Sequence, residues 1–272
     1  MPRIKLILSD IDSTIMPRGA ARVSDRTLAA FHAALEAGLV IGPASGRGFA
    51  QIAPFFAGDT ACFATCIATN GLEVYHGGER ICAQYLPREA LEQTLAALRD
   101  IPRAGLICFD GAHPLLVAGE RADLAERMPG YAEACDVVGA LPDQPIIKAN
   151  AFMASDALTT EEFCAQLNRA APALDFDIPL PGYLNIMPAG WNKGSAVKHL
   201  CDHLGIGLNE VVVFGDAGND LTMFDVVENA VAVANASPEA AAAARWHIGA
   251  CADDAVATAI EQLAADEWPF VR

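Results

Sequence analysis

The amino-acid sequence predicts an α/β protein with a doubly wound, Rossmann-like parallel sheet and an inserted α+β domain. At both ends of the chain, short apolar runs alternate with amphipathic helical patterns, which is typical of parallel β-α-β units. The middle third instead mixes helical patterns with several candidate strands and is bordered by prolines. A chain of 272 residues with 53% hydrophobic residues can bury the core that such a fold needs.

The N-terminal part predicts one complete β-α-β unit. Residues 4–9 form a short apolar run that leads into acidic residues, as expected of a buried parallel strand with functional groups at its carboxyl end. Apolar residues then recur at helical spacing between a possible cap at Ser24 and a stop at Gly38. Residues 39–42 predict the second buried strand of the unit.

The C-terminal third repeats this alternation. It predicts strands at residues 211–214 and 230–234 and helices at residues 219–227 and 238–246. Because β-α-β units build parallel sheets, we expect the two ends of the chain to share one sheet.

The middle of the chain predicts a separate α+β domain. We assign residues 86–183 to this domain, and residues 1–85 and 184–272 to the core. The helices expected in it span residues 88–99 and 159–170, and the strands span residues 105–109, 115–118, 146–153 and 174–178.

The composition excludes several classes of protein. An excess of 34 acidic over 18 basic residues gives a formal net charge of -16, which repels polyanions and argues against nucleic acid as a partner. No apolar run approaches the roughly 18 residues that cross a bilayer, and the first one is too short for a signal peptide, so we expect no membrane partner and a cytoplasmic location. The eight cysteines include no CxxC pair, so core thiols are expected rather than a disulfide framework or a zinc knuckle.

Polar residues follow each of the first two predicted strands. Asp10 and Asp12 stand two positions apart directly after the first strand, so both can point into the crevice where open α/β sheets bind ligands. Ser45-Gly46-Arg47 follows the second strand and offers a hydroxyl group and backbone N–H groups at the start of a helix. Such a turn suits an anion.

Two further polar segments lie in the C-terminal third. Lys193 stands immediately before an amphipathic helical pattern. The strand at residues 211–214 leads into a glycine-rich turn that contains Asp216, Asn219 and Asp220. Like the first strand, this one leads directly into acidic residues.

Together these segments resemble the motifs of the haloacid dehalogenase-like superfamily, and in particular its Cof-type phosphatases with a C2 cap. The matching elements are Asp-x-Asp-x-Thr from Asp10, Ser-Gly-Arg from Ser45, Asn70-Gly71, Lys193-Gly194, Gly-Asp-x-x-Asn-Asp from Gly215, and Asn235-Ala236. The long gap between the second and third motifs is where this superfamily carries C2 caps. Ser13 replaces a more usual Gly and Asn192 a more usual Ser, and neither change removes a needed functional group.

The resemblance implies a phosphatase mechanism. Asp10 would be the nucleophile that forms an aspartyl phosphate, and Asp12 would be the general acid and base. The catalytic lysine would be Lys193. The groups that bind the phosphate would come from Ser45, Gly46, Arg47, Asn219 and Lys193.

The resemblance also implies Mg²⁺ as the cofactor. Its oxygen ligands would come from Asp10, the backbone carbonyl of Asp12, and Asp216. Asp220 would either hold a water molecule of the metal or orient Lys193.

Some assignments stay open at this point. Arg47 could contact phosphate or pair with an acid at the edge of the domain. His199 and His203 lie four positions apart on the predicted helix, and a solvated face explains them better than a metal site. Candidate substrate contacts in the inserted domain are His113, Lys148, Tyr183 and Asn185.

The expected activity is hydrolysis of a small phosphorylated metabolite, such as a sugar phosphate or a similar monoester. One alternative is a phosphomutase or phosphotransferase, because a second acceptor could attack the same phosphoaspartate. Another is a non-catalytic sensor of phosphorylated metabolites. The sequence selects no particular metabolite and no oligomeric state.

Overall fold

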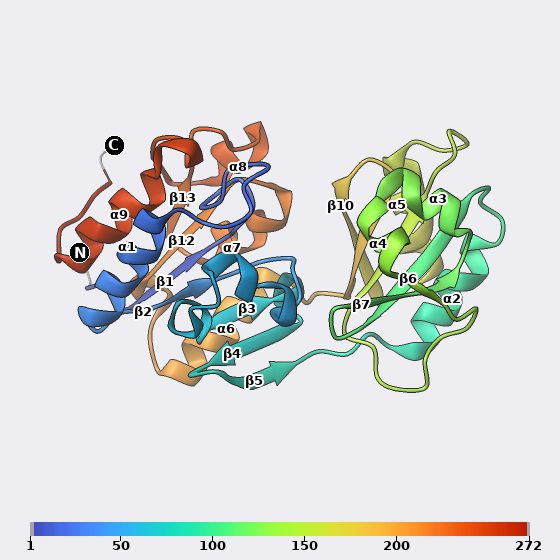
Figure 1. The fold of residues 1–272 in the computed structure, drawn as a ribbon, viewed down its shortest axis with the longest axis horizontal. Coiled ribbons are helices and arrows are strands. Elements are labelled where there is room, and N and C mark those ends of the chain that lie inside the picture. The colour runs from blue at the N-terminus through green and yellow to red at the C-terminus, as the bar shows by residue number, and fades with distance from the viewer. Residues whose placement is uncertain (1–2, 271–272) are drawn as a thin grey trace. The chain divides into compact units, whose positions relative to one another are not determined.

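The computed structural model describes residues 3–270, which divide into two compact units (Figure 1). Unit 1 contains residues 3–83 and 192–270, and unit 2 contains residues 84–191. The boundary predicted at residue 184 is wrong. Residues Tyr183–Pro188 form strand β11, which pairs with β10 (Leu174–Leu180) and with β9 (Ala149–Met153) in the sheet of unit 2.

Unit 1 is built on a five-stranded parallel sheet with the strand order β14-β13-β12-β1-β2. Its strands are β1 (Leu6–Ser9), β2 (Val40–Pro43), β12 (Val211–Gly215), β13 (Asn229–Ala232) and β14 (Trp246–His247). The central strand β1 pairs with β2 on one side and with β12 on the other, and Leu6 lies opposite both Val40 and Val211. Both ends of the chain therefore contribute to one sheet, as the sequence predicts.

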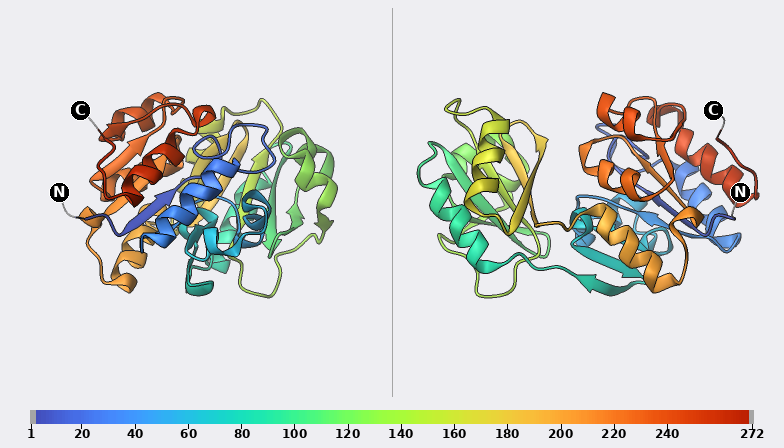
Figure 2. Two further views of the ribbon diagram at one scale, coloured as in Figure 1. Left: turned by 60° about the vertical axis from the view of Figure 1, so that its left-hand side comes forward. Right: turned by 180° about the vertical axis from the view of Figure 1, so that it is seen from behind.

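Helices cover both faces of this sheet (Figures 1 and 2). Ile7 belongs to the core cluster that contains the buried residues of α1 and α9, whereas Leu6 and Leu8 belong to the cluster with α6 and α7. This alternation along β1 follows from the opposite directions of successive side chains in a strand. The helices are α1 (Asp25–Glu36), α6 (Lys193–Leu204), α7 (Leu221–Val226), α8 (Pro238–Ala243) and α9 (Ala255–Ala264). The three-layer arrangement confirms the predicted fold class.

Two of the helices predicted in the C-terminal third are shorter than expected. The pattern at residues 219–227 is divided into a 3-10 turn and α7. The pattern at residues 238–246 ends at Ala243, because Trp246 starts β14 and pairs in parallel with Val231 of β13. A long-range pairing thus overrides the local helical pattern at Trp246.

A small antiparallel sheet completes unit 1. It consists of β3 (Cys66–Ala68), β4 (Glu73–His76) and β5 (Glu79–Ala83) in that order. A parallel bridge between Ala44 and Ile67 connects this sheet to the end of β2. The 3-10 turns of the unit are η1 (Phe49–Gln51), η2 (Ala53–Phe56), η3 (Thr60–Phe63), η4 (Thr69–Gly71), η5 (Leu208–Glu210), η6 (Gly218–Asp220) and η7 (Cys251–Asp253).

Unit 2 is an α+β domain around a six-stranded sheet with the order β10-β11-β9-β6-β7-β8. All neighbours are antiparallel except β7 and β8. The remaining elements are α2 (Arg88–Leu98), β6 (Ala104–Asp110), β7 (His113–Ala118), α3 (Arg121–Arg127), α4 (Pro129–Ala134), β8 (Asp136–Val137) and α5 (Thr160–Ala170). The sequence analysis did not predict α3, α4 and β8.

No helix between residues 3 and 270 combines the length and the apolar character that a membrane crossing requires.

Candidate active site

The site is built where β1 and β12 end side by side. Asp10 directly follows β1 and Asp216 directly follows β12, and the two strands are parallel neighbours. The backbone N–H of Asp10 donates to the carbonyl of Phe214 at 2.9 Å, which fixes the start of the Asp10 loop against β12. The parallel pairing therefore brings two carboxylates from distant parts of the sequence to one edge of the sheet.

A buried lysine connects the two acidic segments. Lys193 is the first residue of α6, and its Nζ lies 2.8 Å from Oδ1 of Asp10 and 2.7 Å from Oδ1 of Asp220. The side chains of Lys193 and Asp220 are fully buried, and that of Asp10 is 9% exposed. Burial favours the neutral form of Lys193, but Asp10 and Asp220 together raise the pKa of the ammonium group above its usual value. This lysine thus stays charged inside the protein.

Asp220 uses both of its carboxylate oxygens within unit 1. Oδ1 accepts from Lys193, and Oδ2 accepts from the backbone N–H groups of Asp216 and Ala217 at 3.0 and 3.1 Å. A Cβ atom on Gly215 would lie 2.6 Å from Cβ of Asp220, so only glycine allows this approach. Of the two roles predicted for Asp220, these contacts favour the one that orients Lys193.

The carboxylates around Lys193 carry more negative charge than its single positive charge can balance. Burial, and then Asp220 and Asp216, raise the pKa of Asp10, although Lys193 acts against this. Burial and the nearby Asp220 also raise the pKa of Asp216 to about 6, while the hydroxyl of Thr14 donates to its Oδ1 at 2.9 Å. Oxygens of Asp10, Asp216 and Asp220 all lie within 4.8 Å of one another. This surplus of converging carboxylates fits a divalent cation with oxygen ligands.

Asp12 lies at the open side of the site and is paired with Arg47. Nε and Nη2 of Arg47 donate to the two carboxylate oxygens of Asp12, each at 2.8 Å. The side chains are 39% exposed for Arg47 and 48% exposed for Asp12. The Arg47 guanidinium also lies 4.4 Å from the centre of the Phe55 ring. Of the two alternatives for Arg47, pairing with an acid is therefore the one observed, and that acid is the proposed acid/base.

Ser45, Gly46 and Asn219 gather around Asn70. The backbone N–H of Asn70 donates to the Ser45 carbonyl at 3.0 Å, and the amide of Asn219 donates to Oδ1 of Asn70 at 3.2 Å. A Cβ atom on Gly46 would lie 3.0 Å from the same Oδ1. Asn70 is in the left-handed region with φ = 53°, which asparagine tolerates better than most residues. Asn70 thus contacts three of the residues predicted to bind phosphate.

Three side chains with no predicted role also support the site. Thr14 holds Asp216 as described, and Asn70 connects two of the motifs. Asn235 donates to the carbonyl of Ser13 at 2.8 Å and accepts from the N–H of Cys251 at 2.9 Å, which anchors the Asp12 loop. All three belong to sequence motifs, so the signal was present, but a motif does not reveal which partner an amide or hydroxyl group will contact.

The weaker candidates lie elsewhere. The ring of His203 contacts that of His76 at 5.6 Å, and neither His199 nor His203 belongs to a metal-ligating group among the described residues. In unit 2, His113 pairs with Asp136. The other three candidates there are placed as follows: Lys148 lies over the ring of Phe109, Tyr183 is buried in the apolar cluster of that unit, and Asn185 accepts a hydrogen bond from Asn150.

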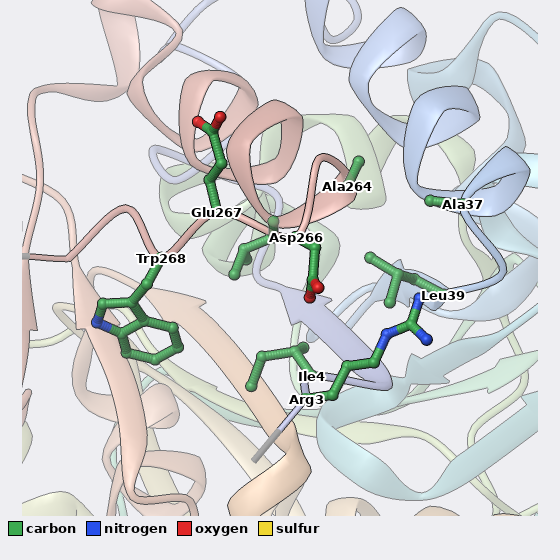
Figure 3. A pocket seen from close by; sticks show the side chains of 9 residues that line it. Arg3, Ile4, Ala37, Leu39, Ala264, Asp266, Glu267 and Trp268 are labelled. Carbon is green, nitrogen blue, oxygen red and sulfur yellow. The ribbon is translucent and has the colours of Figure 1, made fainter. Parts of the chain in front are cut away.

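A separate cavity of about 460 Å³ lies at the opposite end of β1 (Figure 3). Ile4 precedes β1, whereas Asp10 follows it, so the cavity and the Asp10 site are at different ends of the strand. Its lining consists of Arg3, Ile4, Ala37, Leu39, Leu263, Ala264, Asp266, Glu267 and Trp268. None of the candidate catalytic residues lines this cavity.

Comparison with known proteins finds relatives that match most of this chain. A sequence model of haloacid dehalogenase-like hydrolases matches residues 7–260. The HMP-PP phosphatase of Serratia proteamaculans is 27% identical over 250 residues, which cover 86% of this chain and 85% of that protein. The 5-amino-6-(5-phospho-D-ribitylamino)uracil phosphatase YbjI of Escherichia coli is 26% identical over 275 residues and 98% of both chains. The structure of SMU.1108c from Streptococcus mutans shares the fold, with a TM-score of 0.84 at 19% identity, over 96% of this chain and 99% of that one.

Proposed function

We infer that this chain, which belongs to the haloacid dehalogenase-like hydrolases and is a phosphatase, hydrolyses the phosphate monoester of a small metabolite through a phosphorylated Asp10. The observation that carries this proposal is the buried contact of Lys193 with Asp10 and Asp220 where two parallel strands end. A charged lysine held against a carboxylate in a buried site is suited to phosphoryl transfer, which needs a nucleophile and a positive charge close together.

Asp10 is the proposed nucleophile. One of its carboxylate oxygens forms a bond to phosphorus while the bond between phosphorus and the alkoxide of the metabolite breaks. Lys193 holds Asp10 in orientation, and its ammonium group has a third N–H, beyond the two that face carboxylates, with which to donate to a phosphate oxygen. Water then breaks the aspartyl phosphate, releasing inorganic phosphate and restoring Asp10.

Asp12 is the proposed acid and base for both halves of the reaction. It gives a proton to the leaving alkoxide and later takes one from the attacking water. Arg47 donates to both oxygens of Asp12 in the structure, so proton transfer requires this arginine to move aside. An incoming phosphate supplies oxygens that the guanidinium can bind instead, because Arg pairs with phosphate as well as with carboxylate.

Mg²⁺ is the proposed cofactor, held by carboxylate oxygens of Asp10 and Asp216 and by the backbone carbonyl of Asp12. When bound, it supplies positive charge that offsets the repulsion between these carboxylates and a phosphate dianion. The support is the acidic cluster itself, in which burial and the neighbouring carboxylates raise the pKa values of Asp10 and Asp216. Thr14 fixes the orientation of Asp216 through its hydroxyl.

The proposed substrates are sugar phosphates and similar monoesters, and unit 2 is proposed to select among them as a C2-type cap. The Escherichia coli relative, whose name describes a phosphorylated ribityl compound, supports this class. The proposed catalytic groups all belong to unit 1, so unit 2 is available for recognition. We also propose a cytoplasmic location, supported by eight cysteines that form no disulfide.

A panel of phosphorylated metabolites tests the proposal, with release of inorganic phosphate as the readout. We expect turnover of one or more monoesters in Mg²⁺, loss of turnover after EDTA treatment, and recovery when Mg²⁺ is added back. Asp10→Asn should abolish phosphate release from every substrate, because it removes the nucleophile with little change of shape. Undiminished release after exhaustive EDTA treatment, or in Asp10→Asn, would contradict the mechanism.

The role of unit 2 has a test of its own. Residues 84–191 can be replaced by the corresponding segment of a relative that has a different substrate preference. The preference should follow the grafted segment, while the requirement for Mg²⁺ stays unchanged. If the preference stays with unit 1, the assignment of unit 2 is wrong.

A further inference from the structure

A second group of metal-binding side chains lies in unit 1, separate from the Asp10 site. His32 belongs to α1, Cys62 belongs to η3, and Asp59 is the residue that caps η3. His32 Nε2 lies 2.6 Å from Oδ2 of Asp59 and 4.0 Å from Sγ of Cys62. The three ligand atoms all lie within 4.8 Å of one another. A nitrogen, an oxygen and a sulfur atom from two elements therefore converge on one small space.

We propose that His32, Asp59 and Cys62 bind one thiophilic divalent cation, with Zn²⁺ as the expected ion. Imidazole, thiolate and carboxylate are the ligands that Zn²⁺ takes in proteins, whereas Mg²⁺ and Ca²⁺ prefer oxygen alone. Bond lengths of about 2.0–2.3 Å at tetrahedral angles place ligand atoms roughly 3.3–3.6 Å apart. To reach this geometry, the contact between His32 and Asp59 must open by less than 1 Å, and the distance from Cys62 Sγ to His32 Nε2 must close by less than that.

The ligands are held in place by their neighbours in the sequence. Phe31, next to His32, and Phe63, next to Cys62, are both buried and both pack against Phe56. The other oxygen of the Asp59 carboxylate, Oδ1, accepts from the backbone N–H of Ala61 at 3.2 Å, so this side chain already has a fixed orientation. A site whose ligands are positioned by packing and hydrogen bonds loses little entropy when it binds metal.

Burial and charge also suit a zinc ion. The side chains of His32 and Asp59 are 45% and 34% exposed, whereas Cys62 is fully buried, so the site is open to solvent on the side of His32 and Asp59. Water can fill the fourth ligand position on that side. Binding to Sγ releases the thiol proton to the buffer, and the complex of one carboxylate, one thiolate and Zn²⁺ is then electrically neutral.

Such an ion would connect α1 to η3. The segment 44–65 between β2 and β3 contains no strand and only short 3-10 turns, so a metal bridge to α1 would add a fixed point in it. A ligand that binds only the folded state stabilises it. We therefore expect the metal to raise the melting temperature without taking part in phosphate hydrolysis.

Cobalt spectroscopy on the full chain tests the site directly. Metal-free protein is titrated with Co²⁺ in the presence of excess Mg²⁺, which competes for the acidic cluster. A charge-transfer band between thiolate and Co²⁺ should rise to saturation at one equivalent and disappear when Zn²⁺ is added. The Asp10 site contains only oxygen ligands and gives no such band.

Three variants and one control make this assignment specific. Cys62→Ser should remove the band, and His32→Gln and Asp59→Asn should each weaken Co²⁺ binding at least tenfold. Cys201→Ser replaces another buried cysteine and should leave the band unchanged. Absence of the band in the wild type, or its persistence in Cys62→Ser, would overturn the proposal.

Thermal melts give a second readout if Cys62→Ser folds poorly. His32 is half-exposed, so His32→Gln should fold, keep its Mg²⁺-dependent phosphatase activity and lose the Zn²⁺-dependent rise in Tm. An equal rise in Tm for the wild type and His32→Gln would show that Zn²⁺ binds elsewhere, and the site would be rejected.

Discussion

Replacement of Lys193 by Met tests how the buried charges of the active site contribute to stability. The substitution keeps an unbranched side chain of similar length, removes the ammonium group and replaces one methylene by sulfur. Asp10 and Asp220 then lose the cation that lies 2.8 and 2.7 Å from them in the structure. Two carboxylates remain, with side chains that are 9% and 0% exposed, so solvent can replace little of the lost contact.

The expected loss is large. Removal of one partner of a buried ion pair destabilises a protein by about 3–5 kcal/mol, because the remaining charge is left without compensation. Lys5→Met is the matched control. Lys5 lies 2.7 Å from Glu210, but 51% of its side chain is exposed, so solvent screens that pair. We expect the control to change stability far less than Lys193→Met, although the nitrogen–oxygen distances in the three ion pairs are similar.

Urea denaturation of the metal-free proteins, followed by far-ultraviolet circular dichroism, measures both losses. The pH dependence provides an independent check. Burial already raises the pKa of Asp10, and Lys193→Met removes the group that acts against this rise. A carboxyl group whose pKa is higher in the folded state binds protons more tightly there, so it destabilises the fold increasingly as the pH rises above about 4. The deficit of Lys193→Met should therefore shrink as the pH is lowered.

Two results would refute this reasoning. If Lys193→Met lost no more stability than Lys5→Met, the contacts of Lys193 would not be compensating buried charge. If its deficit were the same at every pH, the two carboxylates would not be the origin of the loss.

Three other substitutions test separate parts of the structure. In stopped-flow traces, Asp12→Asn should release about one equivalent of nitrophenolate from p-nitrophenyl phosphate and then turn over about 10²–10⁴ times more slowly than the wild type, because no base activates the attacking water. Turnover of a sugar phosphate at the wild-type rate would show that another residue is the general acid and base. Thr14→Val should weaken Mg²⁺ binding, measured by calorimetry, about 10–100-fold. Mg²⁺ binding to the wild type should also weaken as the pH falls through about 6, where Asp216 takes up a proton. Unchanged affinity in either experiment would contradict the assignment of Asp216 as a metal ligand. Gly42→Ala should lower the free energy of unfolding by at least about 1–3 kcal/mol, since its Cβ would lie 1.7 Å from the carbonyl oxygen of Thr65; an unchanged urea midpoint would contradict this contact.

The sequence predicted the central strands well because their local pattern and their function coincide. Residues 4–9 and 211–214 are apolar runs that end in acids, and such runs are typical of buried parallel strands. The sequence analysis predicts no strand over residues 183–188, so the boundary at residue 184 leaves most of β11 in the wrong domain. The pairing of β11 with β9 and β10 places it in unit 2, and the pairing with β9 depends on residues far away in the sequence.

The site shows the same division between local and distant information. The motifs gave the residue types at the two strand ends, and the parallel pairing of β1 with β12 brings those ends together. The partner of a polar side chain was harder to predict. Arg47 had two possible partners, and its bond to Asp12 depends on how two separate loops approach each other. The hydrogen bond between Thr14 and Asp216 joins residues 202 positions apart, which no local pattern encodes.

The position of β12 next to β1 also constrains the order in which the chain can fold during synthesis. Leu6 is translated before unit 2, but its partner Val211 follows only after the whole of unit 2 has been translated. At about 5–20 residues per second, β1 waits roughly 10–40 s for this neighbour. During that time unit 2 can fold, whereas the apolar strand β1 has β2 on only one side. A nascent chain released before residue 211 would therefore expose the unpaired edge of an apolar strand, which chaperones can bind, and would lack Asp216 and Asp220.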